Sequence, residues 1–237
     1  THRHTLFPYT TLFRSHPFIH MPAGLAKLVA FKSINWSYQT EPEPQLNNRR
    51  LYWPRGKVLG GSSSINAMCY IRGQREDYDA WAAAGNRGWS WSEVLPYFRL
   101  SEANQRGADA LHGSSGHLSV EDLRHHNPLS AAFLDAAVAA GHHRNPDFNG
   151  VDQAGFGYYQ VTTRNGQRCS SAVGYLREAQ RRANLTVVTR AHATRILFDR
   201  QRAVGVEARV GRQTMRFEAA REVLLSGGAV NSPQLLM

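Results

Sequence analysis

The chain has 237 residues, of which 42% are hydrophobic and 19% are charged, and its formal net charge is +10. These proportions exclude an intrinsically disordered chain and are typical of a globular protein with one large or two small domains. No stretch approaches the roughly 18 consecutive apolar residues of a membrane span, so none is expected. The arginines are scattered rather than gathered in a basic run, so the charge does not predict a nucleic-acid partner.

The first fifteen residues, 1–15, have neither helical nor strand periodicity. The run Thr5–Ser15 resembles the in-frame translation of a sequencing adapter, so we treat 1–15 as non-native and expect the native sequence to begin near His16. A short edge strand is the alternative for this segment. In the loop-rich stretch that follows, Trp36 and Tyr38 alternate with polar residues, which predicts a short extended segment.

Three helices are predicted in the middle of the chain from capping residues and apolar spacing. The first covers Asp77–Ala84 and ends at a Gly-Asn pair. The second begins after Ser90, because Glu93 stands at the spacing of a capping box. The third covers Pro128–Ala140, has apolar residues on one face, and is followed by Gly141 as a C-terminal stop.

The last third of the chain is predicted to be more regular. A helix over 170–182 precedes a strand at Leu185–Thr189, and the apolar run Glu222–Ser226 indicates a buried parallel strand. Ser232 and Pro233 suit the N-cap and the first residue of a final helix. Between these elements, three alternating segments predict a β-meander: Ala193–Phe198, Ala203–Val210 and Thr214–Ala219.

Cysteine and histidine residues give no metal site. Cys69 and Cys169 are too few for a disulfide framework and lack metal-binding spacing, which favours a reducing compartment and a cytoplasmic location. The pairs His125–His126 and His142–His143 flank the helix predicted at 128–140 and could suggest a metal. Without a third ligand at a suitable spacing, solvated surface histidines are the better interpretation.

The segment Gly56–Asn66 is the sharpest chemical signal. Its adjacent glycines, Gly60 and Gly61, remove Cβ atoms where a backbone must approach a flat or anionic ligand. Three successive serines offer hydroxyl and N–H groups, and Arg55 and Lys57 add positive charge beside them. From these residues alone, a cofactor or anion site and an ordinary Gly/Ser-rich turn are equally good interpretations.

The wider context of this segment favours the cofactor site. The run Arg55–Gly73, followed by Asp77-Tyr-Asp and Trp81, resembles the first signature of the glucose–methanol–choline (GMC) oxidoreductase family, and Gly228–Met237 resembles the start of its second signature. Further similarities occur in the family's order at Trp36–Pro42, Gly85–Trp89 and Gly166–Ser170. The resemblance extends from about His16 to Met237.

The resemblance implies an α/β fold, with part of a Rossmann-like FAD-binding domain that includes the β-meander, and part of a smaller substrate-binding lobe. The FAD-binding domain would comprise 16–108 and 167–237, and the lobe 109–166. The implied activity is FAD-dependent oxidation of a primary alcohol, in which hydride passes to flavin N5. A small-molecule alcohol is the implied substrate, and oxygen or a quinone the electron acceptor, between which the sequence does not choose.

The resemblance also assigns residues to the cofactor. Asn66 stands where some members of the family attach flavin covalently through a histidine, so noncovalent FAD is expected. The implied contacts to FAD comprise a glycine-serine run, the four residues after it that face the isoalloxazine ring, and one position at the adenine half: Val58, Gly60, Gly61, Ser62, Asn66, Ala67, Met68, Cys69 and Ala193.

Two parts of a complete flavoenzyme are not expected within the chain. The glycine fingerprint G-x-G-x-x-G has only a partial counterpart at Gly155–Gly157, which we interpret as a strand or turn. The family's catalytic histidine is expected beyond Met237, so none of the eleven histidines is a catalytic candidate and the fragment alone is expected to be inactive. A noncatalytic flavin-binding module and a hydroxynitrile lyase remain the alternatives.

Overall fold

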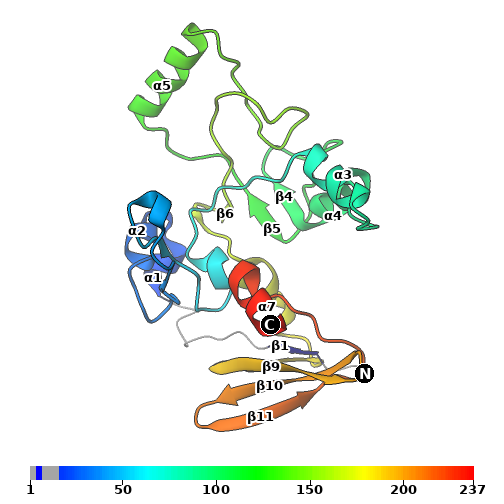
Figure 1. Ribbon diagram of the computed structural model, residues 1–237. Helices are drawn as coiled ribbons and strands as arrows, with labels where there is room; N and C mark the ends of the chain where they lie inside the picture. The colour runs from blue at the N-terminus through cyan, green and yellow to red at the C-terminus, as the bar shows by residue number, and fades with distance from the viewer. Residues whose placement is uncertain (1–3, 7–15) are drawn as a thin grey trace. The chain divides into compact units, whose positions relative to one another are not determined.

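A computed structural model of the chain describes residues 4–6 and 16–237. The chain has a mixed α/β structure and divides into two compact units (Figure 1). Within the described residues, the first unit comprises the N-terminal residues to His16, Ala26–Ile65 and Arg177–Met237, and the second comprises Pro17–Leu25 and Asn66–Leu176. These units are defined by compactness, and the functional division at 108/109 and 166/167 stays a prediction. No helix in the described ranges is long and apolar enough to cross a membrane.

The second unit contains two of the predicted helices, which pack around an aromatic core. Helix α3 covers Arg75–Ala83 and α4 covers Trp91–Ser101, and the backbone N–H of Ser90 donates to Oε2 of Glu93 (3.1 Å), which confirms the predicted capping box. The two helices enclose buried Tyr78, Trp91 and Val94. The side chain of Asp79 accepts from the backbone N–H of Trp91 (2.9 Å) and ties the start of α4 to α3.

The rest of the second unit is built from short strands and long loops. Strand β4 (Glu102–Asn104) pairs in parallel with β5 (Leu118–Val120), where a strand is expected from the alternation of residues 117–120. Helix α5 (Pro128–Ala139) is capped by the side chain of Asn127 and confirms the third predicted helix. The remaining short elements are α1 (Pro17–His20), η1 (Pro22–Gly24), β6 (Thr163–Arg164), β7 (Gln167–Arg168) and a π-helical segment η4 (Ala172–Leu176).

The helix predicted over 170–182 is present as one continuous helical run over 171–179, most of it π-helical rather than α-helical. It consists of the π-helical η4 and the short α6 (Arg177–Ala179). A Cβ on Gly174, inside the π-helical segment, would lie 2.9 Å from the backbone oxygen of His117, so the chain approaches its neighbour closely there.

The β-meander of the first unit is confirmed. Strands β9 (Ala191–Asp199), β10 (Arg202–Val210) and β11 (Gln213–Glu218) form an antiparallel sheet of order β11-β10-β9, in which Val206 faces Ile196 on one side and Phe217 on the other (Figure 1). The other elements of the unit are short. They comprise β1 (His4–Leu6) paired in parallel with β8 (Leu185–Val187), β2 (Tyr38–Gln39) paired with β3 (Tyr52–Trp53), η2 (Pro44–Leu46), and α2 (Leu25–Leu28) at the junction of the units.

Three residues of the segment predicted to be non-native, 4–6, therefore form strand β1, and most of that segment, 1–3 and 7–15, lies outside the described residues. Of the extended segment predicted at Trp36 and Tyr38, only Tyr38 lies in a strand, β2, because Ser37 between them has a φ angle of +55°. Because β2 and β3 have two residues each, their sheet depends on the packing of neighbouring side chains rather than on the length of its hydrogen-bond ladder.

Two predictions at the C-terminal end are wrong. Glu222–Ser226 is not a strand, because no described strand pairs with it, and Leu224 is 79% exposed. The last helix, α7, covers Gly228–Leu236 and so begins before the predicted N-cap Ser232. Pro233 lies inside this helix, where it lacks the N–H for one helical hydrogen bond without ending the helix.

Candidate functional site

The glycines of the Gly56–Asn66 segment let its backbone fold back on itself. A Cβ on Gly56 would overlap the carbonyl group of Gly61, so the two backbones touch where only glycine fits. Gly60 and Gly61 have φ angles of +90° and +55°, in the left-handed region, and lead into the 3₁₀ turn η3 (Gly61–Ser64). Apart from its two neighbours in the chain, no atom of the described residues lies within 4 Å of the place where a Cβ of Gly61 would be, so this backbone is open to a ligand.

The serine hydroxyls bind the loop itself. Oγ of Ser62 accepts from the backbone N–H of Gly56 (3.1 Å). Oγ of Ser63 donates to the oxygen of Gly60 (2.6 Å), and that of Ser64 donates to the oxygen of Leu59 (2.7 Å). Since these hydroxyls hold the turn, the loop presents backbone rather than hydroxyl groups to its surroundings.

The two cations beside the loop are stacked on tryptophans. The guanidinium of Arg55 lies 4.9 Å from the ring centre of Trp53, and Nζ of Lys57 lies 5.1 Å from that of Trp36. Trp36 also packs against the ring of His192 (5.8 Å) on β9. Burial, then the charges of Arg209 and Lys57, lowers the pKa of His192, so the imidazole is neutral at neutral pH.

These contacts connect the loop with β9 and α7 inside the first unit. Ala193, the position expected at the adenine half of FAD, follows His192 directly and is partly exposed. Trp36 stacks on Tyr38 (5.7 Å between ring centres, 9° between planes). The amide of Asn231 in α7 donates to the hydroxyl of Tyr38 (2.8 Å). This hydrogen bond joins two segments that each resemble part of the GMC pattern, Trp36–Pro42 and Gly228–Met237. The two bonded residues are 193 positions apart in the chain.

The predicted cofactor residues of the first unit differ in what they expose. Val58 is a core residue with 2% of its surface exposed. Gly60 and Gly61 are partly exposed, and Ser62 is exposed. The structure brings these four residues together in one turn, with Ala193 on β9 of the same unit.

The predicted residues that face the flavin, Asn66–Cys69, belong to the second unit and form a tight turn. Oδ1 of Asn66 accepts from the backbone N–H of Met68 (3.1 Å), and Met68 has a φ angle of +65°, which is strained for a residue with a side chain. The oxygen of Met68 accepts from the backbone N–H of Thr162 (2.8 Å). Met68 is buried, whereas Asn66, Ala67 and Cys69 are exposed.

Arg168 holds this turn in place and is a functional residue that sequence reasoning did not assign. Its side chain is buried, and Nη1 donates to both the backbone oxygen (2.7 Å) and Oδ1 (2.8 Å) of Asn66. Nε donates to the oxygen of Ile19 (2.9 Å). Burial lowers the pKa of Arg168 to about 10, so the guanidinium remains charged at neutral pH. The motif Gly166-x-Arg168-x-Ser170 was the sequence feature that could have indicated a role for Arg168.

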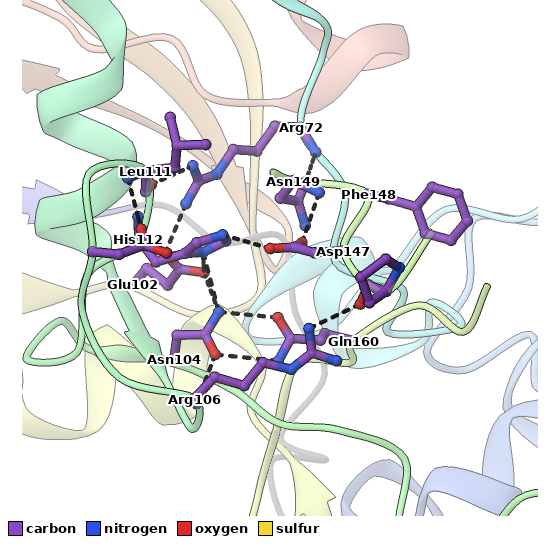
Figure 2. Close-up of polar contacts among 12 residues, drawn as sticks. Arg72, Glu102, Asn104, Arg106, Leu111, His112, Asp147, Phe148, Asn149 and Gln160 are labelled. Atoms are coloured by element: carbon purple, nitrogen blue, oxygen red, sulfur yellow. Dashed lines mark hydrogen bonds and ion pairs between the residues drawn. The ribbon is translucent and has the colours of Figure 1, made fainter. Parts of the chain in front are cut away.

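A second cluster missed by the sequence analysis is a buried ion network in the second unit (Figure 2). Nη2 of Arg72 lies 2.7 Å from Oε2 of Glu102, with side-chain exposures of 2% and 0%. His112 lies between two carboxylates, with Nδ1 3.1 Å from Glu102 and Nε2 2.9 Å from Asp147. Because these residues are separated by up to 75 positions in the chain, no local spacing could have indicated the network.

The remaining histidines and glycines give no further site. Within 4–6 and 16–237, no group of three or more His, Cys, Asp or Glu residues could hold a metal ion. The rings of His126 and His142 pack on Tyr158 (4.2 Å) and Phe156 (5.0 Å). The Gly155–Gly157 run forms a bridge to Arg144 and leads into no helix, in agreement with its interpretation as a strand or turn.

An open, aromatic groove of about 510 Å³ lies between α5 and residues 148–159 of the second unit. Phe133, Phe148, Phe156 and Tyr159 are among its lining side chains, and Phe133 is 63% exposed. This groove lies inside the predicted substrate-binding lobe at 109–166.

Comparison with known proteins agrees with this geometry. The family described as "GMC oxidoreductase" matches residues 14–237. "Alcohol dehydrogenase [acceptor]" of Pseudomonas putida is 50% identical over 94% of this chain and 41% of its own length, and human "Choline dehydrogenase, mitochondrial" is 47% identical over 92% and 37%. The chain thus spans about two fifths of the curated relatives it matches.

Comparison with a solved structure supports the fold. The crystal structure of pyridoxine 4-oxidase from Mesorbium loti superimposes with a TM-score of 0.92 at 32% identity, over 99% of this chain and 46% of the oxidase. The mixed α/β structure is therefore that of solved relatives over nearly half of their length. The chain belongs to the GMC oxidoreductase family.

Proposed function

We propose that the chain forms the flavin-contacting part of an FAD-dependent oxidoreductase that acts on the CH–OH group of a primary alcohol. The observation that carries this proposal is the open backbone at Gly61, which follows Gly60 in a left-handed turn held by the loop's own serines. Membership of the GMC family supports FAD as the ligand of that backbone. When bound, FAD would supply the acceptor for the hydride of the alcohol.

The residues present fit this cofactor. Val58, Gly60, Gly61 and Ser62 would lie along the flavin and its pyrophosphate, and the space left by the missing Cβ of Gly61 would permit a close approach. Ala193 would contact the adenine half through its backbone. The backbone of the turn Asn66, Ala67, Met68 and Cys69 would face the isoalloxazine ring. Hydrogen bonds from Arg168 to Asn66 hold this turn.

The flavin is proposed to be noncovalent. Asn66 stands at the position of the family's flavin-linking histidine, and a side-chain amide is not a nucleophile of comparable strength. Oδ1 of Asn66 already accepts hydrogen bonds from Met68 and Arg168. Acid precipitation should therefore release all flavin into the supernatant, and flavin that remains with the pellet would contradict noncovalent binding.

The fold and the relatives support the remaining parts of the proposal. We infer that β8, the meander and α7 belong to a Rossmann-like FAD-binding domain, and that the groove beside α5 belongs to a smaller substrate-binding lobe. Relatives named as alcohol and choline dehydrogenases support a small-molecule alcohol as substrate.

No histidine of this chain is assigned as the catalytic base. His112, the most buried candidate, already points both ring nitrogens at carboxylates and is therefore unable to accept a proton from an alcohol. His192 is packed on an indole ring. The chain's own residues thus bind and orient the cofactor rather than move the proton of the substrate.

The proposal is tested with the FAD-loaded holoprotein that contains this chain, mixed anaerobically with choline and with simple primary alcohols. The proposal expects at least one alcohol to bleach the visible absorption of the flavin. Flavin that is bound but never bleached would favour the noncatalytic module, and cleavage of a cyanohydrin without bleaching would favour a hydroxynitrile lyase. Failure of the full protein to bind any flavin would contradict the oxidoreductase, the noncatalytic module and the lyase alike.

A further inference from the structure

The buried network around His112 has no role in binding FAD directly, yet it reaches the turn proposed to face the flavin. We propose that His112 is a positioning residue, clamped as an imidazolium between Glu102 and Asp147, that holds the loop around Asn149 against Tyr70–Arg72 and so fixes the Asn66–Cys69 turn. The link to flavin rests on the proposed function, whereas the clamp stands on contacts within the second unit alone.

The hydrogen-bond partners require protons on both ring nitrogens of His112. Nε2 lies 2.9 Å from Oδ2 of Asp147, and Nδ1 lies 3.1 and 3.2 Å from the two oxygens of Glu102 (Figure 2). Asn104 also approaches Nδ1, but its amide hydrogens go to Glu102 (3.0 Å) and to Gln160 (2.9 Å). The backbone N–H of Arg106 donates to Oδ1 of Asn104 and fixes the orientation of that amide.

The charges in the network balance. Arg72 and protonated His112 face Glu102 and Asp147, and the backbone N–H of Gly113 adds a further donor to Glu102 (3.0 Å). Hydrogen bonds to Asp147 and Glu102, against the opposing effect of burial, raise the pKa of His112 to about 9. The other ionisable groups that face the cluster are Asp109, which accepts from the backbone N–H of His112, the Arg106–Asp122 pair, and the Tyr70 hydroxyl near Arg72.

The clamp reaches the turn through two amide side chains, those of Asn149 and Gln153. Oδ1 of Asp147 accepts from the backbone N–H of Asn149 (2.9 Å). The side chain of Asn149 then bonds the backbone of Arg72 (2.8 Å) and of Tyr70 (3.0 Å) much as a neighbouring strand would. Gln153 donates to the oxygen of Arg72 (2.9 Å). Since Tyr70 follows the Asn66–Cys69 turn directly, a shift of the Asp147 loop moves the end of that turn.

Loss of the proton from His112 would leave its two carboxylate neighbours around a neutral ring with only one N–H. One of the two contacts would then change from a charged hydrogen bond to a repulsive approach of two acceptors. The clamp is therefore closed below a pH of about 9 and opens as the pH rises through that value.

Hydrogen exchange at the backbone N–H of Arg72, which donates to Oδ1 of Asn149, measures the clamp without flavin. In the full protein that contains this chain, with and without FAD, we expect exchange of the Arg72 amide, corrected for its intrinsic pH dependence, to accelerate about tenfold or more as the pH rises through about 9. In the His112→Gln variant, this amide should exchange rapidly at every pH. His125→Gln changes an exposed histidine outside the network, and its amide exchange should follow that of the wild type.

The outcomes separate this proposal from the flavin assignment. A wild type without an exchange step near pH 9 overturns the clamp, whatever becomes of the flavin, and this result does not depend on whether His112→Gln folds. FAD affinity, measured by flavin fluorescence, should fall with the same step in the wild type. If the step appears while FAD affinity is independent of pH, the positioning role is overturned. If no FAD binds at any pH, the proposed function fails and the clamp is judged by exchange alone.

Discussion

The guanidinium of Arg168 donates from one nitrogen to both the backbone oxygen and Oδ1 of Asn66, at 2.7 and 2.8 Å. The two residues are 102 positions apart, so this contact closes a long loop of the second unit. It also supports a strained turn, because Asn66 in turn holds Met68 at a positive φ angle. Arg168 is therefore the structural support of the turn that we assign to the isoalloxazine ring.

Arg168→Lys should destabilise this turn although the charge is kept. An ammonium group has no planar fork and is unable to reach Ile19 and both oxygens of Asn66 together. We expect a loss of about 1–3 kcal/mol in the free energy of unfolding, measured with urea. Arg212→Lys, at an exposed position of the meander, is the matched control and should change it by less than about 0.5 kcal/mol. Equal effects of the two substitutions would refute the supporting role.

Glu102→Gln should be much more damaging than its surface counterpart. It removes the charge that neutralises Arg72 and His112, where the side chains of Glu102 and Arg72 are almost fully buried. Breaking a buried pair costs roughly 3–5 kcal/mol, whereas an exposed pair contributes about 0–1 kcal/mol. Asp135→Asn, which breaks the exposed pair with Arg144, provides the comparison in the same urea experiment. Similar losses from the two variants would show that the network is not a buried ion cluster.

The stability of the second unit should depend on pH in two directions. His112 has a raised pKa, so its contribution is complete below its ordinary value of 6.5 and is lost as the pH rises through about 9. Hydrogen bonding, chiefly from His112, lowers the pKa of Asp147, so its contribution is present above the ordinary value of 3.8 and is lost as the pH falls below it. Urea unfolding should show a maximum between these limits, with an alkaline decrease of up to about 3 kcal/mol.

His112→Gln should abolish the alkaline decrease and leave a weaker acidic one. A wild-type curve that is flat from neutral pH to beyond pH 9 would contradict the double clamp of the imidazole.

Gly56→Ala should distort the glycine-serine loop. A Cβ on Gly56 meets the backbone of Gly61, which is unable to yield as a flexible side chain would. Overpacking of this kind typically costs about 1–3 kcal/mol. Gly227→Ala serves as the control, because its Cβ would come no closer than 3.2 Å to any atom. The melting temperatures of the two variants compare the loss of stability. An unchanged melting temperature for Gly56→Ala would show that the backbones of Gly56 and Gly61 are not in close contact.

The parts of the fold with local signals were predictable. The alternation of residues 193–219 predicted the meander, and Ser90 with Glu93 predicted the start of α4. The predicted strand at 222–226 failed because apolar character indicates burial but does not supply a partner strand. The helix predicted at 170–182 is present over 171–179, but its π-helical segment was not predicted. Gly174 in this segment approaches a backbone oxygen 57 positions away, and no local pattern encodes that contact.

The same distinction applies to the sites. The glycines of the cofactor loop are contiguous, so their chemistry is visible in one motif. Arg72, Glu102, His112 and Asp147 come from separate loops, and only the folded chain brings them together. Turns with irregular backbones, such as 145–153, have no periodicity from which their side-chain partners could be predicted.

The proposed function depends above all on contact between the open backbone at Gly61 and FAD. The most direct measurement is the dissociation constant of FAD for Gly61→Ala compared with Gly211→Ala, both in the holoprotein. The two glycines have φ angles of +55° and +61° and open space where a Cβ would be, so the substitutions impose similar strain. We expect Gly61→Ala to weaken FAD binding roughly tenfold or more, about 1.4 kcal/mol, and Gly211→Ala to leave it unchanged. Equal affinity in the two variants would contradict the claim.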